Sequence, residues 1–215
     1  MSKGEDIFTC FKNVQNIYDE VSEMIQYLEE KFKNTKSPKI IPSKGTGCTW
    51  NSSNSYLNSD HWMNKFFTRY YFSDSKNYKG KAIGFCIWLF DYKEKMMFLE
   101  KPYISCFYLE YDDKITEINR EWFQYAGYYE GYTYHIFDKE YPMYVVAPQG
   151  AAGGLQFNKM IFYILDLTYM SDDEKLDNYV IDPLKKMFKG NMNNFLNNLD
   201  KTPFESIPQD LLHEV

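Results

Sequence analysis

Arginine and alanine are scarce in this chain. The chain also carries more negative than positive charge. Only Arg69 and Arg120 represent arginine, alanine occurs at five positions, and the formal net charge is −6. Proteins that bind duplex nucleic acid depend on arginine for bidentate contacts to bases and phosphates, and on a basic surface. We therefore expect no binding to duplex nucleic acid.

Long apolar runs and paired cysteines are missing as well. No uninterrupted apolar stretch approaches the ~20 residues that cross a membrane, so we expect no membrane span. The first residues lack the charged-then-apolar pattern of a signal peptide, which favours a cytoplasmic location. No C-x-x-C pair exists, so we expect neither a structural zinc site nor a bound cofactor. The four cysteines are Cys10, Cys48, Cys86 and Cys106.

Aromatic residues, in contrast, are abundant. The chain has 20 Tyr, 17 Phe and 4 Trp among its 215 residues. A core with so few alanines must be filled by large flat side chains, and the tyrosine hydroxyls at its edge need hydrogen-bond partners or water. The same excess agrees with a codon bias toward Lys, Asn, Tyr and Phe, or with stacking sites for flat ligands.

An apolar pattern at helical spacing dominates the first 33 residues and predicts one amphipathic helix over about 5–33. Its steps of four and three connect Ile7, Phe11, Val14, Tyr18, Val21, Ile25, Leu28 and Phe32. Cys10, Ile17 and Met24 widen the apolar stripe to three positions in seven, which is typical of a helix that packs on its own core. We therefore favour packing on the body over pairing with a second chain.

The rest of the chain alternates between strand-like and helix-like patterns. The predicted elements are a loop over 34–58, a short helix over 59–71, strands over 82–91 and 103–111, a helix over 116–126, a hairpin of 132–137 with 141–147, and helices beginning at Ser171 and at Asp182. The strand over 82–91 is apolar on both faces, as in a central strand. Residues 155–168 fit either a strand or a buried helix.

This order predicts an α+β fold, with a mostly antiparallel sheet of about five strands covered by N- and C-terminal helices. The arrangement resembles the architecture of PAS- and GAF-type sensor domains, although no motif supports either family. We expect one domain over residues 1–199 and a C-terminal tail over 200–215.

A glycine-rich segment, PQGAAGG at 148–154, follows one of the predicted strands. Backbone N–H groups in such loops bind anions, above all at the N-terminus of a helix. The segment loosely resembles the acyl-CoA loop of GNAT-type acetyltransferases, with Ala152 in place of a glycine. The resemblance implies an acyl-CoA-dependent transferase as one alternative function. Its ligand-binding residues would be Gln149, Gly150, Gly153 and Gly154.

Candidate catalytic residues do not converge in the sequence. Asp91, Glu110 and Asp166 stand near the ends of predicted strands, and carboxylates of this kind hold Mg²⁺ in metal-dependent nucleases. A hairpin of the first two strands would nevertheless place Asp91 and Glu110 at opposite edges of the sheet. A nuclease is thus a second alternative, and no catalytic residue is assigned. The other candidates are His61, His135 and Cys48, and the sequence alone cannot place the acid, base or nucleophile that each would need beside it.

Tyrosines gather around two glycines in the segment 125–134. They are Tyr125, Tyr128, Tyr129, Tyr132 and Tyr134. Such a cluster lines a ligand pocket or a protein-binding surface, or it packs as a sheet face under the first helix. In the absence of a catalytic set, our leading hypothesis is a non-catalytic cytoplasmic sensor or protein-interaction domain. It would bind a small ligand or a protein partner through this aromatic-rich surface. The oligomeric state is left open, and an oligomer formed through the first helix is a further alternative.

Overall fold

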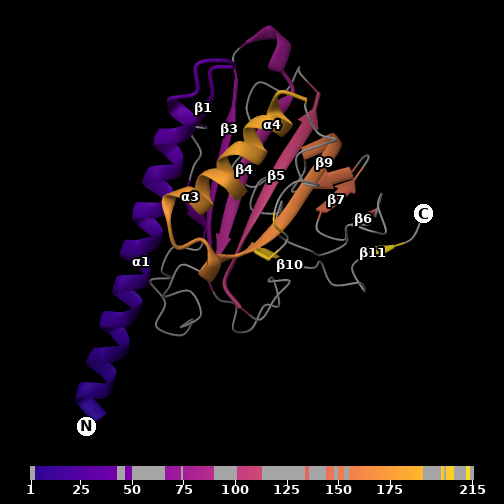
Figure 1. Ribbon diagram of the computed structural model, residues 1–215. Helices are drawn as coiled ribbons and strands as arrows, with labels where there is room; N and C mark the ends of the chain where they lie inside the picture. Colours follow the sequence, from indigo (N-terminus) through magenta and orange to yellow (C-terminus); the bar gives the residue numbers. More distant parts are fainter. Residues whose placement is uncertain are drawn as a thin grey trace.

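The computed structural model describes residues 3–42, 47–49, 66–73, 75–89, 101–112, 134–135, 144–147, 150–152, 155–190, 200, 202–205 and 212–213. Within these ranges, one long helix and a group of short helices cover a face of a twisted sheet (Figure 1). The fold is α+β, as the sequence predicts. Among the described helices, none has the length and apolar character needed to cross a membrane.

The long helix, α1 (Lys3–Lys33), agrees closely with the helix predicted over 5–33. Its second half packs on the body, where Leu28 and Phe32 are completely buried. Its first half extends past the end of the sheet (Figure 1), and Ile7 and Phe11 are 58% and 71% exposed. The prediction that the apolar stripe covers the core is therefore correct for the second half of α1 and wrong for the first half.

Two ion pairs hold the second half of α1 against the body. Lys31 Nζ lies 2.7 Å from Asp177 Oδ2, and Arg69 Nε donates to Glu29 Oε1 at 3.0 Å. The hydrogen bond to Asp177 is the main reason why the pKa of Lys31 is raised above its ordinary value. The helix is thus fixed by its last turns, and its first turns project from that anchor.

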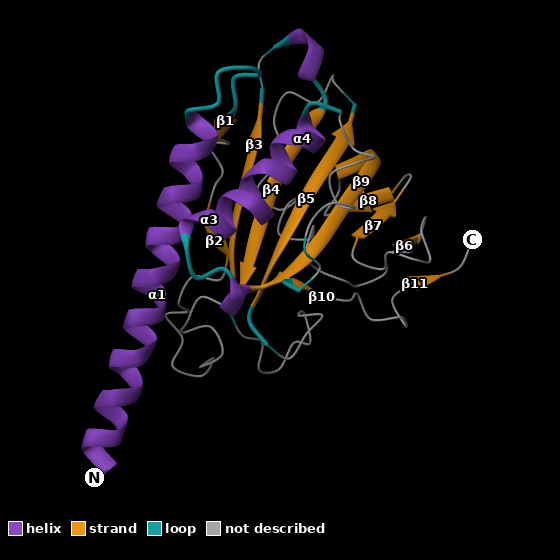
Figure 2. Ribbon diagram, viewed as in Figure 1, coloured by secondary structure: helices purple, strands orange, loops and turns teal. Residues whose placement is uncertain are grey.

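The sheet contains more strands than the five expected, and several of them are very short (Figure 2). Its order is β1-β3-β4-β5-β9-β7-β6-β11, with β2 added to β3, and β8 and β10 added to β9. The pairs are antiparallel except for β6 with β11. The strands are β1 (Ile41–Pro42), β2 (Gly47–Thr49), β3 (Phe66–Phe72), β4 (Lys81–Trp88), β5 (Tyr103–Tyr111), β6 (Tyr134–His135), β7 (Tyr144–Ala147), β8 (Gly150–Ala152), β9 (Leu155–Asp166), β10 (Phe204–Glu205) and β11 (Leu212–His213).

The central strands match the sequence analysis well. β4 and β5 form the predicted antiparallel pair, and β4 is buried on both faces from Ala82 to Trp88. β9 resolves the ambiguity over 155–168 as a strand, and its long register with β5 places it inside the sheet. The predicted hairpin appears as β6 and β7, with His135 opposite Val146. Part of the segment expected as a tail pairs with the sheet as β10 and β11.

The prediction of a short helix over 59–71 is wrong for the residues that the structure describes. Residues 66–72 form strand β3, which pairs with β4 along its whole length. The prediction relied on the spacing of Trp62, Phe66 and Tyr70, which suits one face of a helix. A step of four is also an even number, so the same residues share one face of a strand. Phe66 and Tyr70 are both buried there.

After β9 the chain forms a run of short helical segments. They are η4 (Leu167–Tyr169), α3 (Asp173–Leu176), the π-helical η5 (Asp177–Ile181) and α4 (Asp182–Phe188), and a separate turn, η2 (Lys76–Tyr78), precedes β4. Asp172, not Ser171, caps α3, because its side chain accepts the backbone N–H of Lys175. Pro183 stands in the first turn of α4, but the prediction that a helix starts at Asp182 is wrong, because Ile181 and Asp182 are already helical and the Asp182 N–H bonds to the Asp177 carbonyl of η5. The helix predicted over 116–126 lies outside the described residues.

Candidate functional site

The structure describes only two of the predicted ligand-binding residues. Tyr134 belongs to the short strand β6, and Gly150 begins β8. The others lie outside the described residues: Tyr125, Tyr128, Tyr129, Tyr132, Gln149, Gly153 and Gly154. The aromatic surface over 125–134 therefore stays a prediction.

The described part of the glycine-rich segment is a strand. Gly150–Ala152 pairs antiparallel with the beginning of β9, with Gly150 opposite Phe157. The element that follows is also a strand, so the segment does not lead into the N-terminus of a helix. This arrangement lacks the aligned helix dipole that favours anion binding at such loops.

The three strand-end carboxylates are not brought together where they are described. Glu110 lies near the end of β5, opposite Lys159, whereas Asp166 pairs with Tyr103 at the other end of the same strand. Glu110 accepts a hydrogen bond from the Tyr108 hydroxyl at 2.6 Å. Asp91 and His61 lie outside the described residues. Within the described ranges, no group of His, Cys, Asp and Glu is placed to hold a metal ion.

The two buried cysteines are not activated nucleophiles. Cys86 and Cys106 are completely buried in the sheet, and burial raises the pKa of Cys106 to about 12 and that of Cys86 still further. A thiol in such a position stays protonated and unreactive. Cys10 is exposed on the projecting half of α1.

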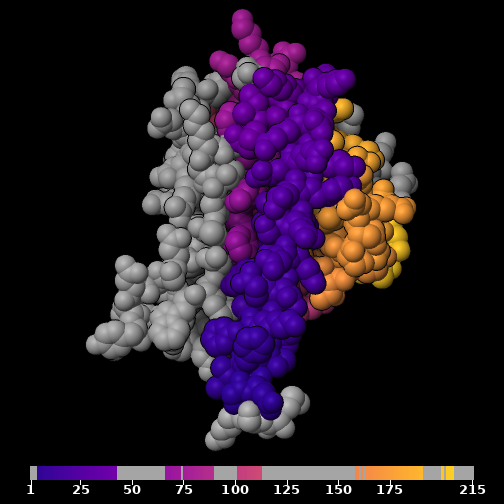
Figure 3. Space-filling view, turned by 90° about the vertical axis from the view of Figure 1, so that its left-hand side faces the viewer, coloured from indigo at the N-terminus to yellow at the C-terminus, as the bar shows by residue number. Residues whose placement is uncertain are grey.

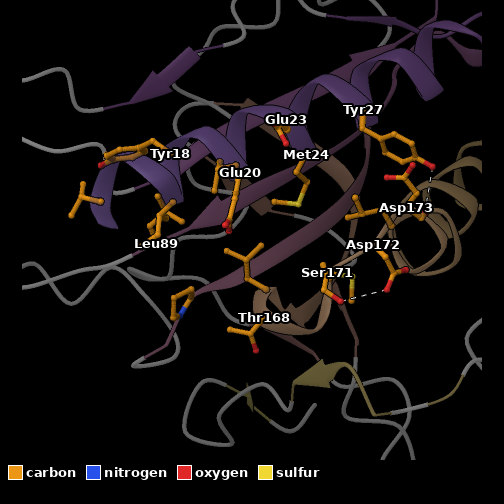
Figure 4. Close-up of a pocket in the computed structure, with 17 residues that line it drawn as sticks. Tyr18, Glu20, Glu23, Met24, Tyr27, Leu89, Thr168, Ser171, Asp172 and Asp173 are labelled. Carbon is orange, nitrogen blue, oxygen red and sulfur yellow. Dashed lines mark hydrogen bonds between the residues drawn. The ribbon is translucent and has the colours of Figure 1, made fainter. Parts of the chain in front are cut away.

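A pocket of about 930 Å³ opens between α1 and the chain segment that follows β9 (Figure 4). We call it the α1 pocket. Figure 3 shows α1 as an indigo ridge beside the orange surface of the helical segments. The lining side chains are those of Val14, Ile17, Tyr18, Glu20, Val21, Glu23, Met24, Tyr27, Leu89, Pro102, Leu167, Thr168, Met170, Ser171, Asp172, Asp173 and Leu176.

Apolar side chains from three parts of the fold make the floor of the α1 pocket. Val21 and Leu176 are buried, and Met24 and Leu167 pack against the core beside them. Helix α1 supplies one wall because its apolar stripe is three positions wide, so residues at its edge remain uncovered by the sheet. At one end, the Tyr27 hydroxyl donates to the backbone oxygen of Asp173 at 3.4 Å and links the two walls (Figure 4).

Carboxylates surround this apolar floor. Glu20 and Glu23 come from α1, and Asp172 and Asp173 from the start of α3. No lysine, arginine or histidine is found among the described residues that line the pocket. Asp172 pairs with Lys175 just outside it, whereas the other three carboxylates form no ion pair within the described part of the chain.

Ser171 belongs to a small hydrogen-bond network in the lining of the pocket. The Ser171 hydroxyl donates to Asp172 Oδ2 at 3.4 Å and accepts a hydrogen bond from Lys175 Nζ at 3.0 Å. The backbone N–H of Lys175 holds the pKa of the Asp172 carboxyl below its ordinary value, which makes this carboxylate a weak base. A nucleophilic serine needs a base with a pKa nearer neutrality. No histidine lines the pocket within the described ranges.

The chain has no match among known protein families, curated proteins or solved structures. The α1 pocket therefore has to be interpreted from its own residues. The apolar stripe that forms one wall, including Ile17 and Met24, is evident from the sequence. The opposite wall is not evident, because nothing in a single sequence places Leu167 and Leu176 beside residues some 150 positions earlier. The one available signal was the pair of glutamates, Glu20 and Glu23, at the edge of the stripe.

Proposed function

We propose that this protein is a non-catalytic interaction domain whose α1 pocket binds a segment of a partner protein. The segment would carry apolar side chains flanked by lysine or arginine. The observation that carries the proposal is the combination of an apolar floor with an acidic rim that includes Glu20, Glu23 and Asp173. Apolar side chains would be removed from water on the floor, and cations would meet the carboxylates around it.

A protein segment suits the surroundings of the pocket better than a small molecule does. The volume alone is within the range of small-ligand sites. However, the apolar surface does not end with the pocket, since it continues along α1 to Ile7. A small molecule would leave this surface in water. Exposed apolar surface of this extent is typical of contacts between proteins.

Binding of a designed peptide tests the proposal. The probe is a fluorescent amphipathic helix of leucine and lysine, about 18 residues long. The comparison peptide has the same leucine face and glutamate in place of lysine. We expect the lysine peptide to bind, with an affinity that falls as salt is added, and the glutamate peptide not to bind. Fluorescence anisotropy measures both.

Two charge-matched variants show whether the pocket is responsible. The variant E20Q/E23Q removes two carboxylates from the rim, and E30Q/D182N removes two exposed carboxylates that do not line the pocket. We expect roughly tenfold weaker binding for the first and less than a twofold change for the second. Equal loss in both variants would mean that the peptide responds only to net charge. That result, or no binding at all, would refute the proposal.

We propose a cytoplasmic location on the sequence features given above. The tyrosine segment 125–134 is a further candidate contact surface.

A further inference from the structure

The apolar wall of the α1 pocket belongs to a longer row on the helix. Steps of three and four residues connect Ile7, Cys10, Val14, Ile17, Val21 and Met24, which we call the outer row. The last four of these residues line the pocket. The first two lie on the projecting half of α1, where Ile7 is 58% exposed and Cys10 is also exposed.

We propose that the partner segment is a cationic amphipathic helix that packs along the whole outer row. This inference rests on the function proposed for the α1 pocket and specifies the shape and length of its occupant. The helix would lie in the pocket from Met24 to Val14 and continue along the projecting half of α1 as far as Ile7. From Ile7 to Met24 the row spans about 26 Å, at about 1.5 Å per residue.

The spacing of the outer row explains why a helix is the expected occupant. Residues that alternate in steps of three and four form a nearly straight ridge on a helix. Such a ridge packs against a second helix at a small crossing angle, of about 20°. A partner of about 18 residues would then bury its own apolar stripe against the row, as amphipathic helices do in apolar grooves.

The negative charges near the outer row indicate that the partner helix is positively charged. Glu20 and Glu23 flank the row at the pocket, and Asp173 faces it from α3. None of the three has an ion-pair partner in the described ranges. A helix with lysine or arginine beside its apolar stripe would supply these partners. A second copy of this chain fits less well, because the described part of its own projecting half, residues 3–20, contains only Lys3 and Lys12 as cations.

Cys10 offers a direct readout of contact with the projecting half. The experiment measures alkylation of Cys10 by iodoacetamide in the full chain, with mass spectrometry of the Cys10 peptide. It is run with and without a saturating amount of the leucine–lysine peptide. We expect the peptide to slow alkylation several-fold, because it covers the outer row. A peptide of about half the length should bind in the pocket and leave Cys10 reactive.

Neighbouring exposed residues provide matched variants. Ile7 lies on the outer row, whereas Phe8 lies about 100° further round the helix. Both are exposed, so neither substitution disturbs the core. We expect Ile7→Ser to weaken binding of the long peptide roughly fivefold and Phe8→Ser to change it less than twofold.

The possible results separate this inference from the proposed function. Binding that depends on Glu20 and Glu23 but leaves Cys10 fully reactive would overturn the long-helix contact and leave the pocket function intact. Absence of binding would overturn both. If light scattering finds a dimer of the protein alone that Ile7→Ser dissociates, a second copy covers the row and the inference is wrong.

Discussion

Gly84 and Phe107 face each other across strands β4 and β5, and the Phe107 ring lies directly against the glycine backbone. A Cβ atom at position 84 would come within 2.9 Å of Phe107 Cε2, and closer still to Phe107 Cζ and the Arg69 carbonyl oxygen. Glycine is required here by close packing, since the ring uses the space that a side chain would occupy. Both residues are in the fully buried centre of the sheet.

Replacing Gly84 with alanine should therefore destabilise the fold. We expect Gly84→Ala to lower the free energy of unfolding by about 1–3 kcal/mol, as inserted methyl groups do in packed cores. Urea unfolding followed by circular dichroism measures the change. In a double-mutant cycle, Phe107→Leu should relieve part of the effect. A stability within about 0.5 kcal/mol of wild type for Gly84→Ala would contradict this account of the contact.

The two halves of α1 should respond differently to the loss of apolar side chains. Leu28 is completely buried and Ile7 is mostly exposed, although both belong to the same predicted stripe. We expect Leu28→Ala to lower the free energy of unfolding by about 2–5 kcal/mol. Ile7→Ala should change it by less than about 0.5 kcal/mol. Similar losses in both variants, measured by urea unfolding, would show that the first half of α1 packs on the body.

Two buried tyrosines should respond in opposite ways to loss of the hydroxyl. The Tyr71 hydroxyl is buried and has no hydrogen-bond partner among the residues that the structure describes, and burial raises its pKa. The Tyr163 hydroxyl donates to the Tyr179 backbone oxygen at 2.9 Å. We expect Tyr71→Phe to raise stability by about 1 kcal/mol and Tyr163→Phe to lower it by a similar amount. Thermal unfolding of the two variants tests this, and a loss of stability in Tyr71→Phe would reveal a partner for that hydroxyl.

Local patterns in the sequence were sufficient to predict the long helix and the central strands. The step pattern of α1 is that of an amphipathic helix, and the apolar runs of β4 and β5 are too short for buried helices and have the length of buried strands. The prediction for the segment of β3 was wrong because aromatic residues four apart lie on one face of either a helix or a strand. Pairing with β4 decides between the two, and this contact joins residues distant in sequence. The prediction that the whole apolar stripe of α1 is buried was wrong for a related reason. The length of the sheet beneath a helix is set by the whole fold.

The α1 pocket could be predicted only in part for the same reason, because it joins residues that are distant in sequence. One wall could be anticipated, because Ile17 and Met24 lie at the edge of a stripe that is wider than a coiled coil needs. The opposite wall depends on how the chain turns after β9, where Asp166 ends the strand and caps η4. Residues such as Leu176 lie beside α1 because of the way the whole sheet is arranged. Their contribution to the pocket depends on tertiary structure alone.

Asp166 links three elements at the end of β9. Its Oδ1 atom accepts hydrogen bonds from the backbone N–H and the hydroxyl of Thr168, at 2.8 Å and 2.6 Å. Its Oδ2 atom lies 3.3 Å from Lys101 Nζ, which also contacts Glu205 Oε1 on β10 at 2.6 Å. Burial alone would raise the pKa of Asp166, but the bonds from Thr168 and the charge of Lys101 outweigh it and lower the pKa.

This lowered pKa predicts how acid affects the fold. A carboxyl group whose pKa is lower in the folded than in the unfolded chain stabilises the fold fully above its unfolded pKa, of about 3.9. The contribution disappears as the pH falls through the folded value. We expect Asp166→Asn to cost about 1 kcal/mol at pH 7 and to lose less stability than wild type between about pH 5 and pH 3. Glu30→Gln, which alters an exposed carboxylate on α1, serves as the control and should follow the wild-type curve. Urea unfolding at several pH values measures these curves, and parallel curves for Asp166→Asn and wild type would contradict the prediction.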